Sequence, residues 1–284
     1  MSQIASMQPM RTADCEPSLT DTQVLEFCRK GFLFFEAVVP DDVNRRVFDF
    51  IPEHGQNALR QQDWFVDNVL LNTPVAGAVR SLLGANFALP VGISNHLMEC
   101  PAPKQNWHRD GGSRYGPEVN NLQVFYYPQD TPTEMGPTEV YPGSHHLFAL
   151  QSWMGHYDQI RGAISTAAPA GSIFITAYSI WHRRGASTAT GTRNLLKYSY
   201  WRTAQPKRDW ILDPDFDLST HEYIPNGLPG QQFRDWYDAA AMFFWLCGDD
   251  RPLLGILGGE GWPMGYPPPR KGANTFPPEG FQRL

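Results

Sequence analysis

The chain has 284 residues, of which 42% are hydrophobic and 18% charged, a composition typical of a soluble globular protein with one large or two small domains. Its net charge of −6 and pI of about 5.7 argue against a nucleic-acid groove or a basic membrane-binding surface. The four scattered cysteines form no zinc-like spacing and favour a reducing, cytoplasmic compartment, and no run reaches the roughly 18 apolar residues of a membrane span.

The N-terminal part of the chain predicts helices around one strand. Residues 1–18 lack the apolar core of a signal peptide, and we predict a mobile tail there. Apolar residues spaced by three and four indicate a first helix that ends at Gly31. Pro74 and Gly84 are typical of the start and the end of a later helix. The expected elements are a helix over 20–31, a strand over 32–39, a helix from Asp41 to about Phe50, and a helix over 73–84.

From about residue 87 the chain changes to short β-rich runs separated by Pro and Gly. Most of these runs have no helical pattern between them, so we expect a mainly β fold with flanking helices, of the jelly-roll or cupin-like barrel type. The core of this barrel would extend to about residue 202. The predicted strand regions are 87–99, 120–128, 138–143, 171–178 and 195–201.

The segment after residue 203 predicts one helix, 231–247, and then an irregular tail rich in Gly and Pro. We expect residues 19–284 to form a single domain, with this segment outside the β core. A further hypothesis is that Trp236–Trp245 and the tail form part of a lid.

The tripeptide His108-Arg109-Asp110 allows three interpretations: a kinase catalytic loop, two metal ligands, or chance. A kinase loop continues as HRDLxxxN and needs a Gly-rich loop, a strand lysine and a DFG motif, none of which is present. On an extended chain, residues i and i+2 point to the same face. His108 and Asp110 would then project together, with Arg109 turned away, and could hold adjacent positions of a metal ion.

A third ligand must come from elsewhere among the eight histidines. His182 is the best candidate, because it directly follows the strand-like run GSIFITAYSIW. His145 and His146 stand in a PGSHH turn, and the remaining histidines have no partner pattern. Two histidines and one carboxylate leave the opposite metal positions open, an arrangement associated with non-haem Fe(II) oxygenases.

Four segments form an ordered set: QNWHRD (105–110), NNLQVFYYPQDTPTEMGPTEVYPGSHH (120–146), APAGSIFITAYSIWHRRGAS (168–187) and TRNLLKYSYWR (192–202). In this combination and order they resemble the phytanoyl-CoA dioxygenase-like family of Fe(II)/2-oxoglutarate oxygenases. The run VLEFCRKGFLFFEAVV near the N-terminus is similar to the opening of the same family.

The resemblance implies a role for four residues directly. His108, Asp110 and His182 match the iron triad of the family. Arg193, eleven residues after His182, matches the arginine that clamps the distal carboxylate of 2-oxoglutarate. An arginine fork suits that task because it binds a carboxylate through two N–H groups and keeps its proton. Gln105 lies where some relatives have a glutamine that contacts the cosubstrate.

One position departs from the family pattern. Many relatives carry a small hydroxyl residue two positions after the distal histidine, where it helps to bind the same carboxylate, whereas this chain has Arg184. Tyr127, Ser187 or Thr192 is a candidate replacement for the missing hydroxyl, and Arg184 itself is another.

By resemblance, the protein is an enzyme that uses Fe(II), 2-oxoglutarate and O2, releases succinate and CO2, and oxidises, by default hydroxylates, a C–H bond. The carboxylate of Asp110 argues against halogenation. We expect a small or medium-sized natural-product intermediate as substrate, and we expect neither nucleic acid nor membrane as a partner; the sequence does not decide between monomer and homodimer.

Two alternatives remain open. The first is an acyl-CoA hydroxylase of the same family, whose CoA phosphates would need a cationic patch such as Arg183, Arg184, Arg202, Lys207 and Arg208. The second is a cupin-like barrel that binds a ligand or metal without redox turnover, or that uses another metal as an isomerase or hydrolase.

Overall fold

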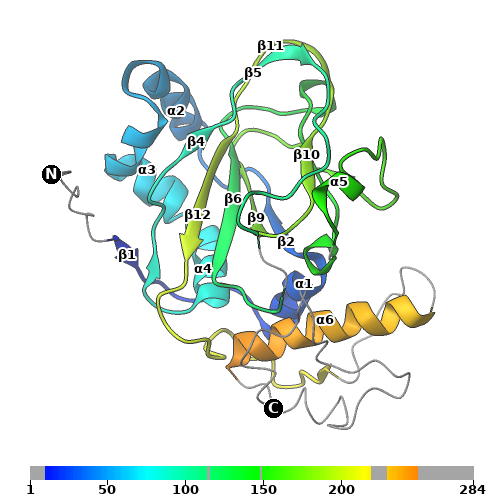
Figure 1. The fold of residues 1–284 in the computed structure, drawn as a ribbon. Coiled ribbons are helices and arrows are strands. Elements are labelled where there is room, and N and C mark those ends of the chain that lie inside the picture. Colours follow the sequence, from blue (N-terminus) through cyan, green and yellow to red (C-terminus); the bar gives the residue numbers. More distant parts are fainter. Residues whose placement is uncertain (1–9, 114–115, 148, 219–228, 249–284) are drawn as a thin grey trace, which may run out of the picture.

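A seven-stranded antiparallel sheet forms the centre of the computed structural model, which describes residues 10–113, 116–147, 149–218 and 229–248 (Figure 1). The strand order is β1-β3-β12-β6-β9-β2, and β4 also pairs with β12. The bounds are β1 (Thr12–Ala13), β2 (Phe32–Phe35), β3 (Phe87–Ala88), β4 (Ser94–Asn95), β6 (Asn121–Tyr127), β9 (Ser172–Ala177) and β12 (Leu196–Trp201).

Two smaller antiparallel sheets accompany the main sheet. One has the order β10-β7-β8 and the other pairs β11 with β5. Val140 of β7 packs with Phe125 of β6 and Phe174 of β9, so the three-stranded sheet lies against one face of the main sheet. The bounds are β5 (Met98–Ala102), β7 (Thr138–Val140), β8 (Ile164–Ser165), β10 (His182–Arg184) and β11 (Ser187–Arg193).

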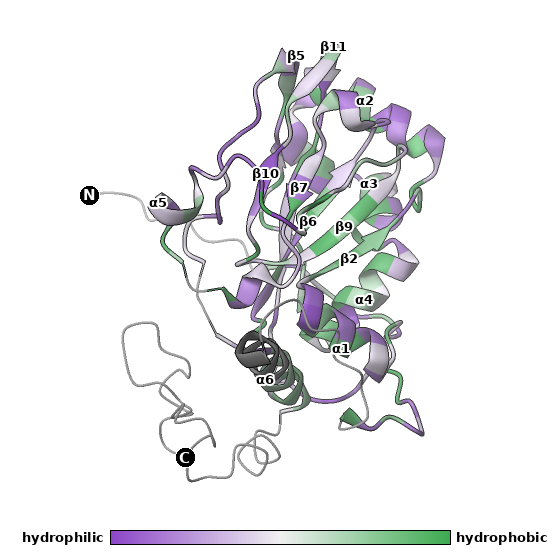
Figure 2. Ribbon diagram, turned by 90° about the vertical axis from the view of Figure 1, so that its right-hand side faces the viewer, coloured by the Kyte–Doolittle hydropathy of each residue, from purple (hydrophilic) through white to green (hydrophobic). Residues whose placement is uncertain are grey.

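Helices from the N-terminal part cover the other face of the main sheet (Figure 2). They are α1 (Asp21–Lys30), α2 (Asp41–His54), the 3-10 helix η1 (Gln56–Gln61), α3 (Asp63–Phe65), the π-helix η2 (Val66–Leu70) and α4 (Thr73–Leu83). The remaining helices are η3 (Thr133–Met135), η4 (Ser144–His146), α5 (Gln151–Met154) and α6 (Pro229–Cys247). The result is a mainly β fold with flanking helices, as predicted.

The period-two pattern of β6 sets the two environments of the main sheet. Leu122, Val124 and Tyr126 join the apolar core beneath the helices. Phe125 and Tyr127 point to the opposite face, where they meet the three-stranded sheet. Alternate residues of β6 therefore pack into the core beneath the helices, and the residues between them pack into the interior between the two sheets.

Most elements lie where the sequence predicts them. Helix α1 ends at Gly31 and α4 at Gly84, both with positive φ angles of 75° and 81° that favour glycine. Helix α2 continues to His54, beyond the predicted end. The predicted strand over 87–99 divides into β3, β4 and the start of β5; Pro90 and Gly92 lie in the first break, between β3 and β4. The helices η1, α3 and η2 were not predicted from the sequence.

The predictions for the N-terminal and C-terminal segments have different outcomes. Residues 12 and 13, which we predicted within a mobile tail, instead form β1 and pair with Ala88 and Phe87 of β3. The predicted C-terminal helix is present as α6, and the tail over 249–284 with its lid hypothesis lies outside the described residues. The division into a single domain over 19–284 stays a prediction.

Each of the four cysteines is a free thiol, and Cys28 and Cys100 are buried. In the part of the chain that the structure describes, no helix is both long and apolar enough to cross a bilayer.

Asp21 joins helix α1 to the segment after β12. Its buried carboxylate accepts hydrogen bonds from Arg208 Nε at 2.7 Å, from Trp210 Nε1 at 2.8 Å and from the main-chain N–H of Asp213 at 2.8 Å. Burial alone would raise the pKa of Asp21, but these hydrogen bonds and the Arg208 charge outweigh burial, and the pKa lies below its ordinary value.

We expect Asp21→Ala to lower the free energy of unfolding by about 2–3 kcal/mol, because it leaves these donors without their buried acceptor. Since the folded-state pKa is the lower one, this stability is complete above the unfolded-state pKa of about 3.9 and is lost as pH falls through the folded value. Urea unfolding of the wild type and the variant between pH 7 and acid pH measures both effects. Asp41→Ala, at an exposed position, is the control and should change the free energy of unfolding little. An equally small change in Asp21→Ala would contradict the expectation.

Candidate metal centre

An antiparallel backbone bridge brings His108 and His182 together. His108 lies in the loop after β5, and His182 opens β10. The N–H of each residue donates to the carbonyl oxygen of the other at 3.0 Å. The two imidazole centroids are consequently 4.5 Å apart. The main chain alone, without help from the side chains, makes these two distant residues neighbours.

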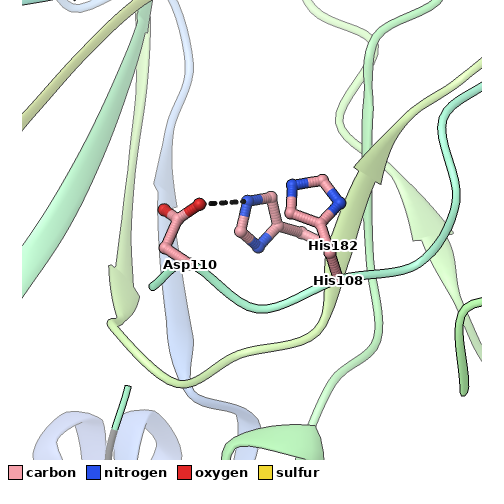
Figure 3. A group of neighbouring side chains, drawn as sticks. All are labelled: His108, Asp110 and His182. Carbon is pink, nitrogen blue, oxygen red and sulfur yellow. Dashed lines mark ion pairs between the residues drawn. The ribbon is translucent and has the colours of Figure 1, made fainter. Parts of the chain in front are cut away.

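Asp110 turns its carboxylate toward the same point (Figure 3). Its Oδ1 lies 3.8 Å from Nε2 of His182. One ligand atom from each of His108, Asp110 and His182 lies within 4.8 Å of the others. Three atoms about 2.0–2.2 Å from one ion on one side of it lie about 3 Å from one another, so the three side chains must move closer together to bind an ion. Arg109 turns away, as predicted, and its Nη2 donates to the carbonyl of Ala149.

Both imidazoles are oriented by main-chain carbonyls. Nδ1 of His108 lies 2.9 Å from the oxygen of Asn106, and Nδ1 of His182 lies 3.1 Å from the oxygen of Ile180. A carbonyl can only accept, so Nδ1 carries the proton in each neutral ring and Nε2 keeps a free lone pair. The donor set of two such nitrogens and one carboxylate fits a divalent metal ion.

Two polar side chains bind the second carboxylate oxygen of Asp110. Oδ2 accepts from Nε2 of Gln123 on β6 and forms an ion pair with Nζ of Lys197 on β12. Burial would raise the pKa of Asp110, but the charges of Lys197 and His182 and these hydrogen bonds outweigh it and lower the pKa. Burial, then the charges of Lys197 and His108, lowers the pKa of His182. At neutral pH the carboxylate is therefore ionised and His182 neutral, the forms that bind metals.

His108 and His182 line an open cavity of about 130 Å³. Its wall combines apolar residues with several cations. The lining residues are His96, Leu97, Met98, Gln105, His108, Phe125, Thr138, His182, Arg183, Arg184, Arg193, Leu195 and Lys197.

Arg193 reaches this cavity from the end of β11. It is only 1% exposed, and its Nη2 donates to Oγ1 of Thr138 at 3.3 Å. Tyr127 lies behind it, with the guanidinium 5.8 Å from the ring centroid. The hydroxyl of Tyr127 accepts from the N–H of Thr138 at 2.9 Å and lies 2.8 Å from Oγ1 of Thr166. Tyr127 thus supports Arg193 and Thr138 and is not among the cavity-lining residues of the described chain.

The other residues considered for the cosubstrate have different positions. Gln105 lines the cavity, and its Oε1 accepts from the N–H of Arg184 at 3.1 Å. Ser187 Oγ accepts from the N–H of Ala102 at 2.7 Å, and Thr192 Oγ1 lies 3.5 Å from Glu99. In the described part of the chain, neither Ser187 nor Thr192 lines the cavity. The hydroxyl that does so is that of Thr138, which the sequence reasoning did not consider.

Three further residues of the cavity region were missed. Gln123 and Lys197 are polar residues at inward positions of mainly apolar strands, which is a signal that the sequence does contain. His96 stands alone without a partner pattern, and burial together with the Lys197 charge lowers its pKa to about 4.

Comparison with solved structures places the fold among known proteins. HygX from Streptomyces hygroscopicus, with nickel and 2-oxoglutarate bound, is 14% identical with a TM-score of 0.54, over 66% of this chain and 88% of HygX. SnoN, a non-haem alpha-ketoglutarate-dependent epimerase from nogalamycin biosynthesis, is 15% identical with a TM-score of 0.51, over 64% and 80%. SnoK, a carbocyclase from the same biosynthesis, is 16% identical with a TM-score of 0.51, over 66% and 88%. These similarities confirm the predicted jelly-roll fold.

The sequence itself matches one family model, that of phytanoyl-CoA dioxygenase, over residues 21–195, which is more than half of the chain. No curated protein sequence matches. The matched region begins with helix α1 and includes His108, Asp110, His182 and Arg193. The chain belongs to the phytanoyl-CoA dioxygenase family and is an Fe(II)/2-oxoglutarate-dependent oxygenase.

Proposed function

We propose that His108, Asp110 and His182 hold one Fe(II) ion and that the enzyme oxidises, by default hydroxylates, a C–H bond of a small or medium-sized organic molecule. The observation that carries this proposal is the convergence of three ligand atoms within 4.8 Å beside an open cavity. Two histidines and a carboxylate leave the remaining positions for cosubstrates. When bound, the iron supplies the O2 chemistry that couples decarboxylation of 2-oxoglutarate to substrate oxidation.

In this proposal Arg193 receives the distal carboxylate of 2-oxoglutarate. Its burial makes the ion pair strong, because water competes little for either partner. Thr138 orients the guanidinium, and Tyr127 packs behind it. Gln105 contributes at the rim of the cavity, where its side chain is fixed by the main chain of Arg184.

A natural-product intermediate is the substrate class that we favour. The structures of similar fold include HygX with hygromycin B bound, and SnoN and SnoK from nogalamycin biosynthesis. An acyl-CoA substrate is less well supported, because most of the arginines considered for its phosphate site have other partners, among them Arg183, which is paired with Glu139. Arg202 donates to the carbonyls of Val119 and Leu82, and Arg208 is paired with Asp21.

Anaerobic addition of Fe(II) and 2-oxoglutarate tests the proposal first. We expect a weak visible charge-transfer band from chelation of the iron, and its absence in well-folded protein would contradict the proposed function. A panel of candidate compounds is then screened with O2 for stimulated release of succinate. A band without O2-dependent succinate formation would favour a barrel that binds ligand and metal without redox turnover.

Gln123 allows a prediction about the orientation of Asp110. Gln123→Leu removes the neutral hydrogen bond to Oδ2, so the carboxylate loses part of what aims Oδ1 at the histidines. We expect the Fe(II) affinity to fall by about 10- to 100-fold, the usual effect of losing a partner of a metal ligand. Thr176→Val is the matched control. Thr176 on β9 stands opposite Gln123, and its hydroxyl donates to the main-chain carbonyl of Gln123 and not to Asp110. Equal affinities for the two variants would show that Gln123 does not orient the ligand.

A further inference from the structure

Arg184 and Arg193 reach the same part of the cavity wall. In the pairing of β10 with β7, Arg184 stands directly opposite Thr138. Side chains at such opposed positions start only about 4.5–5.5 Å apart on one face of the sheet. Arg193 donates from Nη2 to the hydroxyl of that same Thr138. Arg184 and Arg193 are therefore both neighbours of Thr138, the first by strand register and the second by a hydrogen bond, and both line the cavity.

These two guanidinium groups have hydrogen-bond donors left over. Nη2 of Arg184 donates to the carbonyl of Pro103 at 2.8 Å. Nε and Nη1 of Arg184 and Nε of Arg193 are buried, and among the described residues they have no hydrogen-bond partner. A buried donor without an acceptor costs free energy, and such groups are rare in folded proteins. Three of them at one wall indicate that an acceptor belongs there.

The charges point to the same conclusion. Arg183 has Glu139 at 2.6 Å, and Lys197 is paired with Asp110. Within the described residues, Arg184 and Arg193 form no ion pair with a carboxylate. Burial, and then the neighbouring charge of Arg193, lowers the pKa of Arg184. An anion between the two arginines would relieve both the repulsion and the unmet hydrogen bonds.

We propose that Arg184 is a second binding residue for the distal carboxylate of 2-oxoglutarate, so that the cosubstrate is held between Arg184 and Arg193 beside Thr138. This inference rests on the proposed function. A carboxylate offers about four acceptor sites on two oxygens, enough for donors from two guanidinium groups and one hydroxyl. The arrangement replaces the small hydroxyl that relatives carry two positions after the distal histidine with a charged donor, and it makes the site selective for dicarboxylate over monocarboxylate keto acids.

A pair of keto acids tests the role of Arg184 by binding rather than turnover. The anaerobic Fe(II) protein is titrated with 2-oxoglutarate and with 2-oxobutyrate, which has the same keto acid end but no distal carboxylate, and the charge-transfer band is followed. We expect Arg184→Met to raise the Kd for 2-oxoglutarate by about 10- to 100-fold and to leave that for 2-oxobutyrate unchanged. Arg184→Lys, which keeps the charge but not the fork, should fall between Arg184→Met and the wild type.

Lys104→Met is the matched control, because it removes a cation from the same loop region outside the cavity and should change neither affinity. If Arg184→Met left the Kd for 2-oxoglutarate unchanged, or weakened both keto acids equally, the assignment of Arg184 would be overturned. The same holds if only the KM of the oxidised substrate rose, since Arg184 would then serve an acid group of that substrate. A wild-type protein that bound neither keto acid would instead overturn the proposed function itself.

Discussion

Replacing His182 with alanine is expected to abolish measurable Fe(II) binding and 2-oxoglutarate turnover while leaving the fold intact. In the proposed site, Nε2 of His182 is one of three ligand atoms, and its loss leaves two ligands at one side of the ion. The fall in affinity should exceed the roughly 100-fold that accompanies loss of an outer partner of a ligand. The backbone bridge to His108 does not use the side chain, so the loop stays in place. Anaerobic metal titration and succinate release measure both effects.

His96→Ala is the matched control for this experiment. It also removes an imidazole from the wall of the same cavity, but His96 is not part of the converging ligand set. Its metal affinity should equal that of the wild type. If His182→Ala bound Fe(II) as tightly as His96→Ala, the proposed triad would be wrong, whatever the fold similarity suggests.

Arg193→Met is expected to raise the KM for 2-oxoglutarate by about 30- to 1,000-fold. Truncating one partner of a buried, hydrogen-bonded charge pair costs about 2–4 kcal/mol, because the other charge stays buried without compensation. Methionine keeps much of the side-chain volume next to Tyr127, so the packing between the sheets is preserved. Steady-state succinate formation at varied 2-oxoglutarate concentration gives the effect directly.

Metal affinity provides the internal control for Arg193→Met. Arg193 is not one of the three converging residues, so Fe(II) should bind to the variant as to the wild type in the absence of cosubstrate. A variant with normal KM for 2-oxoglutarate would contradict the proposed clamp and would favour the alternative of a cupin-like isomerase or hydrolase, which has no need of this arginine.

The convergence of the three candidate ligands could be predicted from local patterns. His108 and Asp110 project together because they stand two apart on an extended segment, as period-two geometry requires. His182 could be selected among the histidines because it follows a long apolar run; in the structure it is the first residue of β10, after the turn that follows β9. Arg193 required the family resemblance, because spacing from His182 has no meaning without a known fold.

The surroundings of the site could not be predicted in the same way. Gln123 and Lys197 meet at Asp110 only because β6 and β12 are neighbours in a particular register, which a single sequence does not specify. The opposition of Arg184 and Thr138 depends on the pairing of β10 with β7. The strand over residues 12–13 was missed for a related reason, since its partner β3 lies far along the chain.

The alternation of side chains along β6 has a consequence for how such enzymes diversify. A substitution at Phe125, which lines the cavity, alters what a bound molecule meets, whereas its sequence neighbour Val124 is shielded from it on the helical side. Evolution can therefore vary selectivity at every second position of a strand without disturbing the framework that carries it.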